Sequence, residues 1–286
     1  MWEDKTIALP LSRLHYVRTG AGEPLIIVPA TISEISNWKN LIEFMGQKFT
    51  VYFFELPGHG QSTPFTQKYR NELVAQTVRD FTDELGIQKF NLMGFSFGGI
   101  LAMHVLDLMP ERVGKVLLIA PALDVSLLKH AVKNQLVMRF LIFVGQFPVG
   151  QRLYCWACHN ESAKRVFLFF LRKIAHVEHT DQLGKKLGNI RKSTIITLAM
   201  QANELLHLTA FRGKRFEHQC YFAMSKNDPL IDCDKTVEFM RRMFPHSMVK
   251  VVDFPYHQGR EPFSLGFLQQ QFSGVLEKVA KGEVLD

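Results

Sequence analysis

The residues best suited to do chemistry lie in a G-x-S-x-G motif that begins at Gly94 and ends at Gly98. An apolar, β-rich run precedes the motif and a helical run follows it. The strand-to-helix turn expected there is sharp, so small residues are needed at both glycine positions. In this turn Ser96 would project at the carboxyl edge of a sheet, and the Phe97 backbone N–H would point toward an oxyanion. We therefore predict that Ser96 is a nucleophile rather than a buried structural serine.

A serine hydroxyl needs a base to take its proton, and the base needs an acid to orient it. Asp228 follows one predicted strand and His257 follows the next, so both would leave the sheet at the edge that carries Ser96. The order Ser, acid, His is typical of hydrolases in which the nucleophile lies on such a turn. Asp232 and Asp124 remain alternatives for the acid.

The predicted elements that position these residues alternate between strands and helices. Short β-rich runs separated by amphipathic stretches predict βαβ units and a mainly parallel sheet. Two further runs, residues 5–9 and 14–18, predict an antiparallel hairpin at the edge of the sheet. The other predicted strands are 25–28, 50–54, 90–93, 116–119, 220–224 and 248–254, with a helix over 235–243.

The sequence pattern changes between residues 124 and 209, where apolar residues recur at intervals of three and four, starting at Leu127 and Leu128. We predict a helical insertion here, interrupted near Pro148 and weakened at two later glycines, Gly184 and Gly188. The insertion divides the sheet domain into residues 1–123 and 210–286.

Taken together, these motifs resemble the α/β-hydrolase superfamily, in the branch with a helical cap after the sixth strand. Residues 55–62 look like the D-x-x-G-H-G-x-S loop of that family, with Glu55 in place of aspartate. The resemblance covers the whole chain and implies an eight-stranded, mostly parallel sheet with helices on both faces. It implies the triad Ser96, His257 and Asp228. A serine nucleophile argues against the dehalogenases and epoxide hydrolases of the family.

The chain departs from the family at the second oxyanion donor. Where the resemblance implies His-Gly-X, the sequence has Pro29-Ala30-Thr31, so the donors become the N–H groups of Thr31 and Phe97. Pro29 lacks an N–H, but the family does not use that group. Ala30 restricts backbone angles that glycine would allow, and losing one donor costs roughly 10² to 10³ in rate. Weaker or altered activity is therefore expected.

Other motifs are interpreted as structural. Residues 155–159 have the C-x-x-C-H pattern of haem attachment, but no export signal or second C-x-x-C accompanies it. The histidines of residues 176–179 lack the H-E-x-x-H spacing of zinc sites. His59 and His104 are expected to support the fold, and His15 belongs to no motif. We therefore predict no metal and no cofactor.

The net charge of +7 is unevenly distributed. Residues 125–217 hold 15 Lys and Arg against 5 Asp and Glu, a charge of +10, which leaves −3 for the rest of the chain. A basic cap fits an acidic partner or an anionic surface, or is simply a solvated face. No nucleic-acid module is recognisable. No apolar run is long enough to span a bilayer, and no secretory signal is evident, so a cytoplasmic location is expected.

The apolar run at residues 166–171 surrounds its predicted helix and would be buried between cap and sheet or line a substrate pocket. The sequence thus predicts a serine hydrolase that cleaves a carboxylic ester or thioester with a hydrophobic part, without a cofactor. Acyl transfer, carbon–carbon bond hydrolysis and perhydrolysis use the same triad, and a weakly catalytic ligand-binding protein is a further alternative.

Overall fold

The computed structural model describes residues 2–129, 136–174, 191–252 and 264–284. Within these residues, eight strands form one sheet in the order β1-β2-β4-β3-β5-β6-β7-β8, which confirms the predicted fold class. β2 is antiparallel to both β1 and β4, and every other neighbouring pair is parallel. The strands are β1 (Glu3–Ala8), β2 (Arg13–Thr19), β3 (Pro24–Val28), β4 (Thr50–Phe54), β5 (Phe90–Phe95), β6 (Val113–Ile119), β7 (Cys220–Ser225) and β8 (Ser247–Val252).

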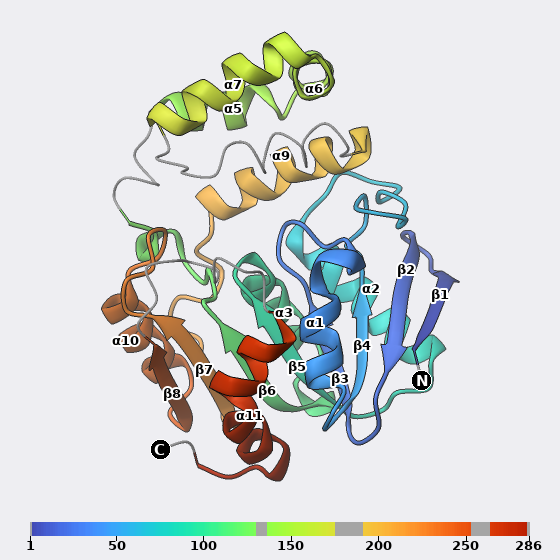
Figure 1. The fold of residues 1–286 in the computed structure, drawn as a ribbon, viewed down its shortest axis with the longest axis vertical. Helices are drawn as coiled ribbons and strands as arrows, with labels where there is room; N and C mark the ends of the chain where they lie inside the picture. The colour runs from blue at the N-terminus through green and yellow to red at the C-terminus, as the bar shows by residue number, and fades with distance from the viewer. Residues whose placement is uncertain (1, 130–135, 175–190, 253–263, 285–286) are drawn as a thin grey trace.

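Helices cover both faces of the sheet (Figure 1). Side chains alternate across each strand, so on β3 Ile26 and Val28 join one core while Leu25 and Ile27 join the other. The first core is completed by α2 (Asn71–Glu84), α3 (Phe97–Leu108) and α10 (Cys233–Met243), and the second by α1 (Ile35–Met45) and α11 (Leu265–Lys281). Two 3₁₀ turns, η1 (Pro110–Arg112) and η2 (Val125–Leu127), flank β6.

Among the described residues, four further α-helices lie between β6 and β7 in the chain and stand beyond the upper edge of the sheet in Figure 1. α9 (Lys192–Leu206) is the inner one. α5 (Leu136–Val144), α6 (Pro148–His159) and α7 (Glu161–Ile174) form an outer layer over it. Their place in the chain matches the predicted insertion, whose limits of 124 and 209 remain a prediction. None of the described helices is both long enough and apolar enough to cross a membrane.

The inner helix α9 is held against the loop of residues 55–62. The Thr194 hydroxyl donates a hydrogen bond to the Gly58 carbonyl at 2.9 Å. Gly58 has a φ of +89°, and a Cβ there would lie only 2.2 Å from Oγ1 of Thr197, so glycine is needed for both reasons. Thr194, Thr197 and the neighbouring Gln201 are all buried. The loop and α9 therefore pack as one unit.

The structure corrects two expectations for the insertion. Its first predicted helical residues, Leu127 and Leu128, instead form the end of a 3₁₀ turn and a β-bridge to Ile231, because this segment pairs with a sheet-domain loop. Val166 and Phe169 are more than half exposed, so the apolar run at 166–171 is not buried on all sides. An amphipathic helix in the outer layer leaves one face to solvent.

Candidate active site

Ser96 sits on a strained turn between two regular elements. It directly follows β5, whose six residues are all buried, and directly precedes α3. Its backbone has φ 52° and ψ −119°, a conformation that residues with a Cβ rarely adopt. Backbone hydrogen bonds hold it there, since its N–H donates to Ile119 and its carbonyl accepts from Gly99 and Ala122. The side chain is partly exposed.

Glycines around Ser96 leave no space for side chains. A Cβ at Gly94 would lie 2.5 Å from the Gly98 carbonyl oxygen, so the strand and the first turn of α3 touch backbone to backbone. A Cβ at Gly98 would lie 2.3 Å from the Val28 carbonyl oxygen and 2.5 Å from that of Pro29. Contacts below 3 Å to backbone atoms cannot be relieved without moving the chain. The turn thus depends on both glycines.

The contact of Gly98 with Val28 and Pro29 also brings the predicted oxyanion loop close to Ser96. Residues 29–34 connect β3 to α1, and β3 pairs with β5 so that Val28 lies opposite Gly94. Thr31 is two residues beyond the Pro29 carbonyl that touches Gly98, and it is half-buried. Phe97 is the first residue of α3, where N–H groups lack partners within the helix. Their roles as oxyanion donors remain predictions.

Asp228 is fully buried in the loop that follows β7. Its Oδ1 accepts hydrogen bonds from the N–H groups of Leu230 (2.8 Å) and Ile231 (3.0 Å), which fixes the carboxylate. Ser96 follows β5 and Asp228 follows β7, and β6 lies between these two strands. Strands separated by one other strand are about 10 Å apart, and an imidazole ring with a hydrogen bond on each side can bridge that distance. His257, the predicted base, lies outside the described residues.

The two alternative acids are each paired with a cation. Asp124 is buried and accepts two hydrogen bonds from the Arg212 guanidinium, at 2.6 and 2.9 Å. Burial opposes ionisation, but the bonds from Arg212 and Ser126 outweigh it and lower the pKa of Asp124. Asp232 caps α10 and forms an ion pair with Lys235 at 3.0 Å. Both carboxylates thus have a structural role.

A family model described as alpha/beta hydrolase fold matches residues 23–149. A solved hydrolase from Pseudomonas aeruginosa superposes with a TM-score of 0.71 and 98% coverage of both chains, at 16% identity. The chain therefore has the α/β-hydrolase fold.

The chain is similar in sequence to proteins whose names describe different activities. An acetyltransferase component of the acetoin cleaving system of Pseudomonas putida is 34% identical over 167 residues, which is 58% of this chain and 44% of that protein. A 2-hydroxy-6-oxononadienedioate/2-hydroxy-6-oxononatrienedioate hydrolase of Paraburkholderia phymatum is 34% identical over 112 residues, 37% of this chain and 39% of the relative. Each match covers less than half of the relative's length.

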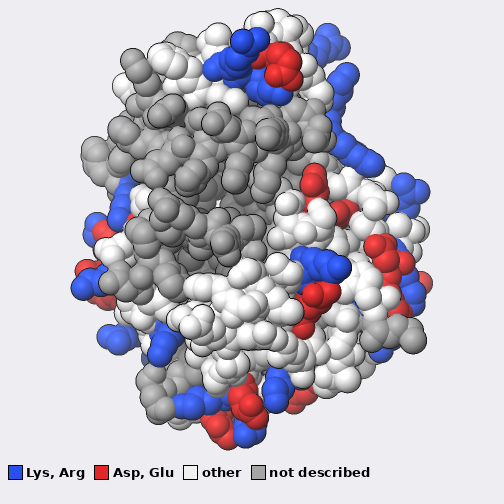
Figure 2. Space-filling model, viewed as in Figure 1, with Lys and Arg blue, Asp and Glu red and all other residues white. Residues whose placement is uncertain are grey.

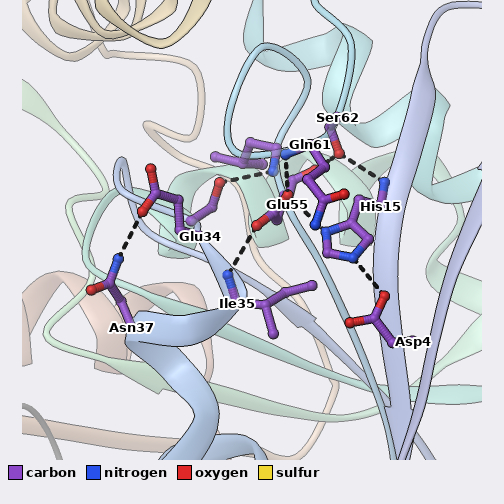
Figure 3. A network of polar contacts seen from close by, with 10 residues as sticks. Asp4, His15, Glu34, Ile35, Asn37, Glu55, Gln61 and Ser62 are labelled. Carbon is purple, nitrogen blue, oxygen red and sulfur yellow. Dashed lines mark hydrogen bonds and ion pairs between the residues drawn. The ribbon is translucent and has the colours of Figure 1, made fainter. Parts of the chain in front are cut away.

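A network of polar groups centred on the buried Glu55 lies next to the predicted oxyanion loop (Figure 3). Glu55, at the end of β4, accepts hydrogen bonds from the N–H groups of Ile35 (3.1 Å) and Gln61 (2.5 Å). The third partner is His15 on β2, whose Nδ1 lies 2.9 Å from the Glu55 carboxylate. Nε2 of His15 lies 2.7 Å from Asp4 on β1. Glu55 thus connects the first turn of α1, the 55–62 loop and two strands.

Sequence reasoning found no role for His15, because its partner lies 40 residues away and only the β2–β4 register brings them together. The one sequence feature that pointed to this network was Glu55, which is longer than the aspartate of the family motif. The glutamate carboxylate fills the space above Gly60, where a Cβ would lie 2.2 Å from it.

The pKa of His15 predicts a pH-dependent contribution to stability. Burial disfavours the charged ring, but hydrogen bonds to Glu55 and Asp4 outweigh it and raise the pKa. A raised folded-state pKa means that the ion pairs stabilise fully below the unfolded value of about 6.5. This contribution is lost as the pH rises through the folded-state pKa.

We therefore expect Asp4→Asn to lower the free energy of unfolding by up to about 1 kcal/mol at pH 5.5, and by clearly less at pH 9, because Asp4 is half exposed. Urea unfolding across this range measures the difference. Asp80→Asn, in the surface pair with Arg79, is the control and should show no such trend near neutrality. An Asp4→Asn deficit that grows with pH would contradict the assignment.

The remaining motif residues occupy structural positions. Burial lowers the pKa of His59 to about 4, against an opposing effect of Gln201, so this ring is neutral. Neither of its ring nitrogens makes a hydrogen bond of ordinary geometry among the described residues. His104 packs edge-on against Phe211 at 4.9 Å between ring centroids. Cys155 and Cys158 are buried against α9, and burial raises the pKa of both thiols.

Proposed function

We propose that this protein is a serine hydrolase that cleaves a carboxylic ester or thioester with a hydrophobic part. The observation that carries the proposal is the strained, hydrogen-bonded turn at Ser96, between a buried strand and the start of α3. Backbone strain of this kind persists only where the surrounding structure enforces it, and it is concentrated at functional sites. The proposed triad is Ser96, His257 and Asp228.

In the proposed reaction, His257 removes the proton from Ser96 as Oγ attacks the substrate carbonyl carbon. The carbonyl oxygen becomes an oxyanion held by the Phe97 and Thr31 N–H groups. As the tetrahedral intermediate collapses, His257 gives its proton to the leaving alcohol or thiol, and an acyl-enzyme remains. Water then attacks the acyl carbon while His257 takes its proton, and His257 returns that proton to Oγ as the bond between Ser96 and the acyl group breaks and the acid is released. Asp228 stabilises the imidazolium in both halves.

Labelling with a fluorophosphonate probe tests the nucleophile directly. We expect covalent modification at Ser96, located by peptide mass spectrometry, and competition for the site by hydrophobic esters. Heat-denatured protein is the control and should not react, because the nucleophilicity of Ser96 depends on the folded site. Labelling of a different serine by the native protein would refute the proposal.

A second candidate is hydrolysis of a carbon–carbon bond next to a ketone. It is favoured by the similarity to the hydrolase from Paraburkholderia phymatum, whose substrate names contain a 6-oxo group. A panel that compares p-nitrophenyl esters of increasing acyl length with 2-hydroxy-6-oxo dienoates separates the two. Higher kcat/KM for the dienoates would make carbon–carbon cleavage the main reaction, with Ser96 as nucleophile in both cases.

A further inference from the structure

The outer layer of the cap exposes an unusual number of large apolar side chains. Among the described side chains of α5, α6 and α7, eight large apolar ones are each more than half exposed, and we call them the outer apolar surface. They are Leu136, Phe140 and Phe143 on α5, Val149, Leu153 and Trp156 on α6, and Val166 and Phe169 on α7. Scattered apolar residues on a surface need no explanation, but a concentration in one layer of helices marks an interaction site.

These residues recur at helical spacing. On α5 they are separated by four and three positions, and the same intervals recur on α6, so each set lies along one side of its helix. The opposite side of α6 already packs inward, where Cys155 and Cys158 lie against Ile195 of α9. On α6 the outer apolar surface is therefore a second apolar face, separate from the one that attaches the helix to α9.

Basic side chains accompany each apolar row. Arg139, Arg152 and Arg165 are exposed and directly precede Phe140, Leu153 and Val166 in the chain. Residues 136–174 hold six Lys and Arg but only one acidic residue, a net charge of +5. That residue, Glu161, is paired with Lys164 at 2.7 Å, and Lys164 is buried. In Figure 2 the upper part of the molecule shows white surface and blue groups with a red group among them, whereas red and blue mix more evenly below.

A groove of about 640 Å³ lies between α6 and α9, beside the outer apolar surface. Its lining includes Arg152, Lys192 and His159 together with the aromatic Trp156. Among the described lining residues none is acidic. Two cations beside an indole ring suit the headgroup of an anionic lipid, and the acyl chains of that lipid could then contact the neighbouring apolar surface.

We propose that the outer layer of the cap binds the surface of an anionic phospholipid bilayer. The apolar side chains enter the acyl boundary, Trp156 lies at the level of the headgroups, and the arginines extend to the phosphates. A second copy of the chain fits less well, because the exposed arginines of the two copies would lie close together and repel each other. An acidic protein partner would neutralise the arginines but leave much of the apolar surface to be covered. This binding is independent of the reaction proposed above.

Vesicle binding by the full chain tests the proposal. We expect co-sedimentation with vesicles of 30% phosphatidylglycerol in phosphatidylcholine at 150 mM NaCl, and affinity at least about tenfold weaker for pure phosphatidylcholine. Brominated lipids should quench part of the tryptophan fluorescence, and Trp156→Phe should abolish that quenching although Trp2 and Trp38 remain. Equal affinity for both vesicles, or quenching that survives in Trp156→Phe, would overturn the proposal.

Two matched charge-reversal variants locate the binding surface. Arg139→Glu, Arg152→Glu and Arg165→Glu together should weaken binding to the anionic vesicles at least about tenfold. The control combines Lys39→Glu, Lys68→Glu and Arg241→Glu, exposed residues of the sheet domain with the same change in net charge, and should bind within about twofold of the parent. Equal loss in both variants would overturn the proposal, because only bulk charge would then matter.

A third variant keeps the charge and removes apolar surface. Phe140→Ser with Val149→Ser should weaken vesicle binding while circular dichroism and hydrolysis of a short water-soluble ester stay unchanged. Absence of vesicle binding by the parent would refute the proposal. In that case, a dimer in sedimentation velocity that the serine variant dissociates would assign the surface to a second copy, and salt-sensitive capture by an acidic carrier protein would assign it to a protein partner.

Discussion

Ser96→Ala is expected to lower kcat on a short p-nitrophenyl ester by about 10⁴- to 10⁶-fold while the fold is retained. The alanine removes Oγ, so only binding and the oxyanion donors remain to accelerate attack by water. Stability should change little, because alanine and serine both carry a Cβ and suffer equally from the φ of 52°. The backbone bonds to Ile119, Gly99 and Ala122 are also unaffected.

Steady-state kinetics and thermal unfolding of the same preparation measure both effects. Ser126→Ala is a suitable control, since this exposed serine lies near the beginning of the insertion and bonds to Asp124, which is not a member of the proposed triad. It should retain parental kcat. If Ser96→Ala kept more than a tenth of the parental kcat with its fold intact, serine catalysis at this turn would be ruled out.

The second large effect is expected for Asp228→Asn, which should lower kcat by about 10⁴-fold with little change in KM. Asparagine keeps an oxygen that can accept from the Leu230 and Ile231 N–H groups, so the loop should hold its shape. Its amide carries no charge to stabilise the imidazolium, and its NH₂ group favours the wrong tautomer of the base. The loss should therefore appear in the chemical step.

Asp124→Asn shows whether Asp124 or Asp228 is the acid that orients the base. It weakens the two-bond pair with Arg212, so we expect a lower melting temperature with kcat within about threefold of the parent. The two substitutions are chemically identical, and both carboxylates are buried. The opposite pattern, with kcat lost in Asp124→Asn and kept in Asp228→Asn, would move the acid to Asp124.

The sheet could be predicted because local pattern suffices for it. Every predicted strand has a counterpart, and the turn at Ser96 follows from the placement of glycines between a strand and a helix. The antiparallel hairpin of β1 and β2 was also predicted, because two short β-rich runs flank a turn. Burial of the strands on both faces leaves few other arrangements.

Other features depend on contacts that no local pattern records. The bond between His15 and Glu55 depends on strand register, and Glu55 has three partners from different elements. The exposure of Val166 and Phe169 was not predicted. An apolar run in a sequence favours burial, but it does not tell which part of the protein would cover it. Lys164 lies buried beside Glu161 although lysine is normally exposed. The predicted base, His257, lies outside the described residues, so its role stays a prediction.

The close contact between α9 and the 55–62 loop divides the cap into two parts with different evolutionary freedom. Because Gly58 has no space for a side chain beneath Thr197, α9 and the loop can change only together. Among the described residues, no comparable contact links the outer helices to the loops of the proposed active site. A library that exchanges residues 136–174 between related hydrolases while retaining α9 should therefore give a high proportion of folded, active chimaeras with new preferences for where they act.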